Sequence, residues 1–329
     1  MPRGAGVQDG GDGWMVDLSV EIGELTLQNP ITPASGSFSW EYDEFIDLNE
    51  LGGLVAKTIC REPRDGNPTP RMAETEAGII QSIGLPGKGI DYFLENIVPE
   101  YAKFDPPLIV SCSSEDPDEF ALLASELSVP DVDVVECNIS CPTRNTSGGN
   151  FALSDEHTGE VVSKLRAATD KPLWAKLSPN AGDIVSIARA AEEAGADALC
   201  IANTFLGLKI RTDNFRPAIG NKYGGMVSPA LKPIVLRMVY QCAKEVKIPI
   251  IGIGGVTKAE DVVEYMLAGA SAVGIGYAAF RNPTALTSII RDLEVWCDNR
   301  GIKRVSELIG AIKDEDMEMD TLTAASQGV

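Results

Sequence analysis

Two lysines, two asparagines and several glycines stand where short apolar runs of the sequence end. They are Lys57 with Thr58, Asn138, Lys176, Asn203 with Thr204, Gly254 with Gly255, and Gly276. If the runs are strands of a parallel barrel, their carboxyl ends open at one mouth and these residues meet there. A lysine is rarely buried without an anion, and two at equivalent strand ends favour a bound anionic cofactor over pairing with carboxylates.

Glycines end the last two predicted strands and indicate what the anion is. Backbone N–H groups at such positions can approach a phosphate that a side chain would obstruct. Gly252-x-Gly254-Gly255 is a weak sign alone, but Gly274-x-Gly276 repeats it on the next strand. It is not a dinucleotide fingerprint, because it lies late in the chain and lacks the downstream acidic residue. A phosphate here, with a lysine at the opposite end, fits flavin mononucleotide (FMN).

Cys141 lies just beyond the fourth predicted strand, in the run Asn138-Ile139-Ser140-Cys141-Pro142. Most cysteines are inert packing residues. This one stands at the predicted mouth, before a segment rich in Gly, Ser and Asn at 143–150. A thiol placed there can attack a substrate or take its proton, so we expect Cys141 to be the proton acceptor of the site.

Composition disfavours several other chemistries. The single histidine, His157, is expected to be exposed at a helix start, which argues against a Ser-His-Asp triad or a histidine-based metal site. The seven cysteines contain no Cys-x-x-Cys pair, so neither a zinc site nor an iron–sulfur cluster held by this chain alone is expected. An odd number of cysteines without a secretory signal indicates free thiols.

The charge and hydropathy of the chain bear on its partners and location. A net charge of −20, from 28 Lys and Arg against 48 Asp and Glu, repels nucleic-acid phosphates and anionic lipid. No apolar run approaches the ~18 residues of a membrane span, and the Gly-rich start is unlike a targeting peptide. We expect a soluble, cytoplasmic protein that binds neither nucleic acid nor membrane.

Short β-branched runs alternate with longer amphipathic segments, which is typical of strand–helix units around a parallel sheet. The predicted strands cover 31–34, 53–58, 108–112, 133–138, 173–177, 198–203, 249–253 and 272–276. Helical spacing covers 119–127, 158–168, 184–194, 231–246 and 259–268. Eight such units favour an α/β fold with a closed (β/α)8 TIM barrel over an open doubly wound sheet.

The barrel is expected to form one FMN-binding domain over residues 16–312, beginning with a short β-hairpin at 16–27. We expect residues 1–15 to be a flexible segment and 313–329 to be a mobile acidic and polar tail. Two long connections, 60–106 and 204–227, interrupt the regular rhythm. Such strand-to-helix connections lie on the catalytic face of a barrel and commonly carry function.

At these residues the chain resembles the dihydroorotate dehydrogenase family, over roughly 16–310. The matching blocks are 29–36 (NPITPASG), Lys57-Thr58, 66–75 (GNPTPRMAET), 83–85, 138–142 (NISCP), 175–180 (AKLSPN), Asn203-Thr204, 252–256 and 269–273. The resemblance implies oxidation of dihydroorotate to orotate in pyrimidine biosynthesis. In that reaction a base removes the C5 proton and FMN accepts the C6 hydride.

The resemblance extends to a particular class. A cysteine in the position of the base is similar to the soluble class 1 enzymes, and the block at 66–75 most resembles class 1B. Membership of class 1B would imply a homodimer core and a second subunit. That subunit would carry FAD and a [2Fe-2S] cluster and pass electrons to NAD.

Carried over position by position, the resemblance assigns most of the mouth to FMN. The implied FMN-binding residues are Ser35, Gly36, Lys57, Thr58, Asn138, Lys176, Gly254, Gly255, Gly276 and Tyr277. The implied catalytic residues are Cys141, as the base, and Lys57. The implied substrate-binding residues are Gln81, Asn138, Asn203 and Thr204.

The substrate side departs from the family pattern, which has Asn at the positions of Gln81, Gly87, Thr143 and Ser111. Gln81 keeps an amide one methylene further out, whereas Gly87 and Thr143 cannot form the same hydrogen bonds. An unsatisfied buried partner costs about 1–3 kcal/mol. These departures leave open a related flavoenzyme that acts on another cyclic amide or an unsaturated carbonyl compound. A flavin-free phosphate-binding barrel, as a lyase or synthase, and a non-catalytic binding barrel stay open too.

Overall fold

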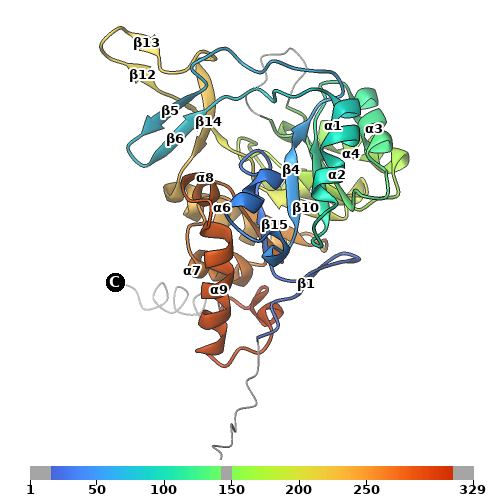
Figure 1. The fold of residues 1–329 in the computed structure, drawn as a ribbon, viewed down its shortest axis with the longest axis vertical. Coiled ribbons are helices and arrows are strands. Elements are labelled where there is room, and N and C mark those ends of the chain that lie inside the picture. Colours follow the sequence, from blue (N-terminus) through green and yellow to red (C-terminus); the bar gives the residue numbers. More distant parts are fainter. Residues whose placement is uncertain (1–15, 142–149, 314–329) are drawn as a thin grey trace, which may run out of the picture.

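The computed structural model describes residues 16–141 and 150–313. Within these ranges, parallel strands form an 8-stranded sheet in the order β3-β16-β15-β10-β9-β8-β7-β4. They are β3 (Ile31–Pro33), β4 (Leu54–Ile59), β7 (Leu108–Cys112), β8 (Val134–Asn138), β9 (Leu173–Lys176), β10 (Ala198–Ile201), β15 (Ile250–Ile253) and β16 (Ala272–Ile275). The predicted α/β class and (β/α)8 TIM barrel are confirmed (Figure 1). Every predicted strand is present, with its ends shifted by two residues at most.

The barrel closes between β3 and β4, which lie side by side. The N–H of Gly52 donates to the carbonyl oxygen of Ile31 at 2.9 Å. A Cβ at Gly52 would lie 2.1 Å from the carbonyl oxygen of Asn29, so no side chain fits between these backbones. Glycine is therefore required where the two strands meet.

Helices follow the strands and cover the outside of the barrel. They are α1 (Ile90–Asn96), α2 (Val98–Tyr101), α3 (Pro117–Glu126), α4 (Asp155–Ala168), α5 (Ile184–Glu193), α6 (Lys232–Ala243), α7 (Ala259–Leu267), α8 (Tyr277–Arg281) and α9 (Ala285–Asp298). Side-chain caps fix three of the starts, because Asp116, Ser154 and Asp183 accept backbone N–H groups of the first turns of α3, α4 and α5. The five predicted helices are confirmed, while α1, α2, α8 and α9 were not predicted.

Shorter elements complete the barrel. A two-stranded antiparallel hairpin of β1 (Val20–Ile22) and β2 (Leu25–Leu27) precedes it, as predicted. Single 3-10 turns lie in the connections: η1 (Trp40–Glu44), η2 (Leu48–Glu50), η3 (Phe151–Leu153), η4 (Pro229–Leu231) and η5 (Val305–Leu308). None of the helices in the described ranges is long and apolar enough to cross a bilayer.

The two long connections fold into a second, antiparallel sheet above the barrel, which we call the cap sheet (Figure 1). The first connection supplies β5 (Met72–Thr75) and β6 (Gly78–Gln81), and the second supplies β11 (Phe205–Leu208) and β14 (Tyr223–Val227). Their order is β11-β14-β6-β5. A small hairpin of β12 (Ile210–Arg211) and β13 (Arg216–Pro217) extends from it. The sequence analysis predicted that both connections lie on the catalytic face, but not that their strands pair with one another in one sheet.

Some sequence expectations concern residues outside the described ranges. These are the flexible segment 1–15, the tail 313–329 apart from Lys313, and most of the segment 143–150, including Thr143. The proposed domain limits at 16 and 312 stay predictions.

The close approach at Gly52 predicts a specific loss of stability. In Gly52→Ala the new methyl group would overlap a backbone oxygen that side-chain movement cannot relieve, so we expect about 2–3 kcal/mol less free energy of unfolding. Gly159→Ala in α4 is the matched control, because a Cβ there meets no atom within 4 Å. Alanine in that helix should stabilise by about 0.5–1 kcal/mol. Urea unfolding of both variants measures this, and equal effects would contradict the closure argument.

Candidate active site

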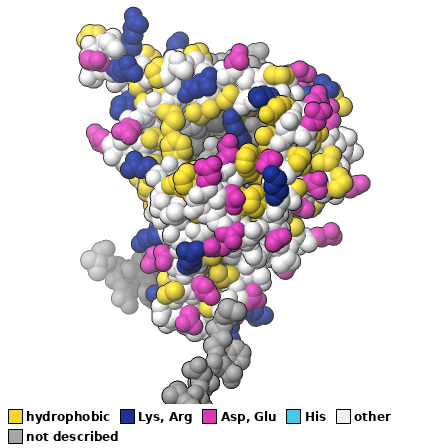
Figure 2. Space-filling view, viewed as in Figure 1, with side chains coloured by type: hydrophobic (Ala, Val, Ile, Leu, Met, Phe, Trp, Pro, Cys, Tyr) yellow, Lys and Arg dark blue, Asp and Glu magenta, His cyan; other side chains and the backbone are white. Residues whose placement is uncertain are grey.

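A cavity of about 400 Å³ opens at the carboxyl ends of the barrel strands, beneath the cap sheet. Figure 2 shows the hollow, with hydrophobic side chains gathered around it. All the residues that the sequence assigned to cofactor, substrate or catalysis line it: Ser35, Gly36, Lys57, Thr58, Gln81, Asn138, Cys141, Lys176, Asn203, Thr204, Gly254, Gly255, Gly276 and Tyr277. The roof is largely apolar and comprises Met72, Ile79, Phe205, Met226 and Val227. The structure thus brings the residues together, and their individual roles stay predictions.

Lys176 ends β9 and is almost wholly buried, with 4% of its surface exposed. Its Nζ donates to Oγ of Ser35 at 2.8 Å and lies 3.5 Å from Oε1 of Glu136, an acid that is itself 2% exposed. Lys176 therefore pairs with a carboxylate, and the expectation that a bound anion rather than an acidic side chain balances it is wrong for this lysine. Glu136 precedes Asn138 by two positions on β8 and so shares its face. That spacing is the signal by which the partner could have been found.

Lys57 has a different environment. Its Nζ donates to the carbonyl oxygen of Pro86 at 2.6 Å, and in the described ranges no carboxylate oxygen lies within ion-pair distance of it. Burial lowers the pKa of Lys57, and the nearby charge of Arg71 lowers it further. Because a carbonyl does not balance the charge of an ammonium group, Lys57 is suited to meet an anionic ligand in the cavity.

Side-chain amides and hydroxyls form a connected layer at the floor of the cavity. Nδ2 of Asn138 donates to Oγ1 of Thr58 at 3.1 Å, and Nδ2 of Asn203 donates to Oδ1 of Asn138 at 3.2 Å. Thr58 in turn shares a 2.8 Å hydrogen bond with Ser111, which is fully buried and does not line the cavity. Ser111 therefore supports Thr58 from below. The layer fixes the direction of each amide before any ligand arrives.

Backbone N–H groups gather at the ends of β15 and β16. Those of Gly254, Gly255, Gly276 and Tyr277 have no hydrogen-bond acceptor in the described part of the chain. Gly255 has φ +70°, and a Cβ there would lie 2.9 Å from the carbonyl oxygen of Pro229. Only glycine is free of strain at this position. Four unpaired donors at one end of a cavity fit the oxygens of a phosphate group.

A second set of unpaired N–H groups lies beside Lys57, in the turn that follows β6. Gly84 has φ +80° and Leu85 has φ +54°, so consecutive residues adopt the left-handed region. Both residues line the cavity, and their N–H groups have no acceptor among the described residues. Successive N–H groups in such a turn form a concavity that binds anions. The block 83–85 was part of the family resemblance, but no feature of the sequence predicts that Leu85 adopts a left-handed backbone conformation.

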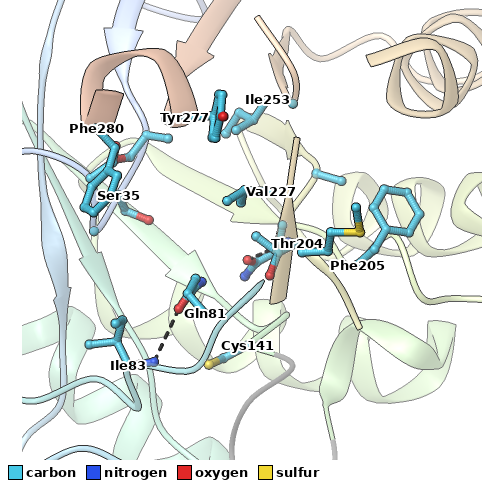
Figure 3. Close-up of a pocket in the computed structure, with 18 of the residues that line it drawn as sticks. Ser35, Gln81, Ile83, Cys141, Thr204, Phe205, Val227, Ile253, Tyr277 and Phe280 are labelled. Carbon is cyan, nitrogen blue, oxygen red and sulfur yellow. Dashed lines mark hydrogen bonds between the residues drawn. The ribbon is translucent and has the colours of Figure 1, made fainter. Parts of the chain in front are cut away.

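The residues that depart from the family pattern have distinct positions. Oε1 of Gln81 accepts the N–H of Ile83 at 3.3 Å, which leaves Nε2 as a donor on the cavity side (Figure 3). Thr204, by contrast, belongs to the matching pair Asn203-Thr204, and its Oγ1 is buried without a hydrogen-bond partner in the described chain. Gly87 does not line the cavity, and a Cβ there would meet no atom within 4 Å.

Cys141 is distinguished from the other cysteines by being both half-buried and part of the cavity lining. Cys112, Cys137, Cys200, Cys242 and Cys297 are buried, whereas Cys60 and Cys141 are half-buried. Burial raises the pKa of both Cys137 and Cys242 to about 12, which suppresses their thiolates near neutral pH. Of the seven, Cys141 is the one that lines the cavity, on the side of Gln81 and Ile83 (Figure 3).

Comparison with known proteins gives consistent matches along most of the chain. A family model described as dihydroorotate dehydrogenase matches residues 17–296. The catalytic subunit of dihydroorotate dehydrogenase B (NAD(+)) of Trichlorobacter lovleyi is 46% identical over 299 residues, covering 90% of this chain and 98% of the relative. The protein of the same name from Bacteroides thetaiotaomicron is 44% identical over 302 residues, covering 91% and 100%.

The buried pair of Lys176 and Glu136 predicts a strong coupling. Glu136→Gln should lower the free energy of unfolding by about 3 kcal/mol, because the ammonium group of Lys176 loses its buried counter-charge. Combining Glu136→Gln with Lys176→Met should return the protein to within about 1 kcal/mol of the parent. Denaturant unfolding of the protein without added ligand measures both. A double variant as unstable as the single one would contradict the pairing.

Proposed function

The chain belongs to the dihydroorotate dehydrogenase family, and we propose that it oxidises dihydroorotate to orotate as the FMN-binding catalytic subunit of a class 1B enzyme. The observation that carries the proposal is the arrangement of one cavity. The unpaired N–H groups of Gly254, Gly255, Gly276 and Tyr277 lie on one side, and Lys57 with the turn of Gly84 and Leu85 lies on another. Cys141 borders the same space.

The residues present fit FMN. The four unpaired N–H groups at the ends of β15 and β16 would hold its phosphate. Ser35, Thr58 and Asn138 would supply hydrogen bonds to its ring. Lys176 would place a positive charge against the ring edge on which negative charge develops. When bound, FMN accepts the hydride that leaves C6 of dihydroorotate.

The substrate side fits a ring that carries a carboxylate. The N–H groups of Gly84 and Leu85 would receive the carboxylate oxygens, with the ammonium of Lys57 beside them. Nε2 of Gln81 is available to a ring carbonyl. Oriented amides at Asn138 and Asn203 and the hydroxyl of Thr204 would complete recognition of the ring. Because the amide layer is already ordered, binding costs little rearrangement of these groups.

Cys141 is placed to act as the base. Its sulfur would take the proton from C5 of the substrate, and its partial exposure gives that proton a route to solvent afterwards. The apolar roof made by the cap sheet excludes water from the reacting carbons, which protects the hydride from loss. Two groups of this chain thus divide the work, with Cys141 moving the proton and Lys57 holding the anion.

We further propose a partner for the electrons. The relatives from Trichlorobacter lovleyi and Bacteroides thetaiotaomicron are catalytic subunits of an NAD(+)-type enzyme, which supports a division between a catalytic and an electron-transfer chain. The partner subunit would carry FAD and a [2Fe-2S] cluster and reduce NAD. A homodimer of this chain and a cytoplasmic location belong to the same proposal.

A related activity on another cyclic amide or an unsaturated carbonyl compound is the second candidate. Gln81 favours it, because its amide lines the cavity one methylene further out than the asparagine of the family pattern. Anaerobic mixing of the purified protein with dihydroorotate and with a panel of dihydropyrimidines decides between the two. Fastest bleaching of the flavin by dihydroorotate supports the first. A colourless protein would point to a flavin-free barrel, and a flavin that no compound reduces would point to a non-catalytic one.

The role of Cys141 gives a direct prediction. Cys141→Ala should keep the yellow colour and the affinity for orotate but slow flavin reduction by dihydroorotate about 10²- to 10⁴-fold, since a positioned base is lost. Stopped-flow absorbance measures the rate. Cys297→Ala, at a buried cysteine of α9 outside the cavity, is the control and should reduce its flavin at the parent rate. An unchanged rate in Cys141→Ala would exclude this thiol as the base.

A further inference from the structure

A cluster of three polar side chains lies behind the turn that carries Gly84 and Leu85. Oγ of Ser82 accepts Nδ2 of Asn67 at 2.7 Å and Nδ2 of Asn221 at 2.9 Å. Ser82 is fully buried and Asn221 is 8% exposed. None of the three lines the cavity, and the mechanism above does not use them.

The hydroxyl of Ser82 joins three segments that are distant in sequence. Asn67 belongs to the connection after β4, Ser82 directly follows β6, and Asn221 lies just before β14. The first two segments come from one long connection and the third from the other. A single buried oxygen therefore joins both halves of the cap sheet at the point where the turn begins.

The same cluster holds the backbone of the turn. The N–H of Asn67 donates to the carbonyl oxygen of Ile83 at 3.0 Å, and the N–H of Ser82 donates to that of Arg71 at 2.7 Å. A Cβ at Gly84 would lie 2.5 Å from the backbone nitrogen of Asn67, so the two backbones are in close contact. Leu85 adopts a strained left-handed conformation that persists only when its surroundings enforce it.

We propose that Ser82 is a positioning residue that sets the preference of the enzyme for a substrate with a carboxylate. By accepting two side-chain N–H groups, it fixes the turn whose free N–H groups at Gly84 and Leu85 face the anion. The inference rests on the proposed function and adds to it a residue that does not touch the substrate. Loss of the hydroxyl removes the acceptor that Asn67 and Asn221 share, so the link between the two connections is broken, the turn relaxes and its donors no longer converge.

The test uses the FMN-loaded full chain and the variant Ser82→Ala. Orotate and uracil, which is the same ring without the carboxylate, are titrated while the flavin absorbance is followed. We expect the dissociation constant of orotate to rise about tenfold, which corresponds to about 1.4 kcal/mol, and that of uracil to change less than twofold. The half-saturating dihydroorotate concentration for flavin reduction should rise equally, with the limiting rate within twofold of the parent.

Two further variants separate positioning from general stability. Asn221→Ala removes one of the two donors and should give a smaller loss in the same direction, even if Ser82→Ala folds poorly. Ser128→Ala is the control, since that hydroxyl bonds Ala124 and Thr169 away from the cavity and should change neither ligand. Equal losses for orotate and uracil, or none, would overturn the role of Ser82. A parent protein that binds uracil but not orotate would overturn the proposed function itself.

Discussion

The arrangement of the mouth depends on one buried charge. A parallel barrel fills its interior with side chains from alternate strands, and an ammonium group there is unfavourable unless an anion accompanies it. The carboxylate of Glu136 meets this need from the neighbouring strand, and the pairing of Asn138 with Lys176 across β8 and β9 sets their register. Lys176 can therefore stand at the mouth without a ligand and still present its charge upward to Ser35. The amide layer and the glycine ends of β15 and β16 are then arranged around a fixed cation.

Two structural parts contribute to the cavity in different ways. The barrel supplies the amide layer at the floor, the four unpaired N–H groups of β15 and β16, and Lys176. All of these lie at the carboxyl ends of strands, so the strand arrangement fixes their positions. The cap sheet supplies Gln81, the apolar roof and, through the turn after β6, the anion-binding N–H groups. The proposed phosphate end of the cavity is thus formed by barrel strand ends, while the proposed substrate end combines strand-end residues such as Lys57 and Asn138 with the two connections.

This division explains what could be predicted from sequence. Residues at strand ends were placed together correctly because parallel strands open on one face, so Lys57, Asn138 and Gly254 needed only the strand pattern. The cap sheet was missed because β5 and β6 are short, and β6, which pairs with β5, also pairs with β14, over a hundred positions away. The left-handed backbone of Leu85 and the hydrogen bond from Lys57 to Pro86 depend on that tertiary pairing too. Glu136 could have been predicted as the partner of Lys176, because it lies two positions before Asn138 and therefore on the same face of the strand.

The pairing of Gln81 with Gly225 across β6 and β14 has a consequence for how this family diversifies. A Cβ at Gly78 in β6 would lie 2.1 Å from the carbonyl oxygen of Val227 in β14, so the two long connections are in direct backbone contact beside the cavity. A side chain larger than glycine at this contact needs a compensating shift in the opposite strand. A change in one connection is therefore coupled to the conformation of the other.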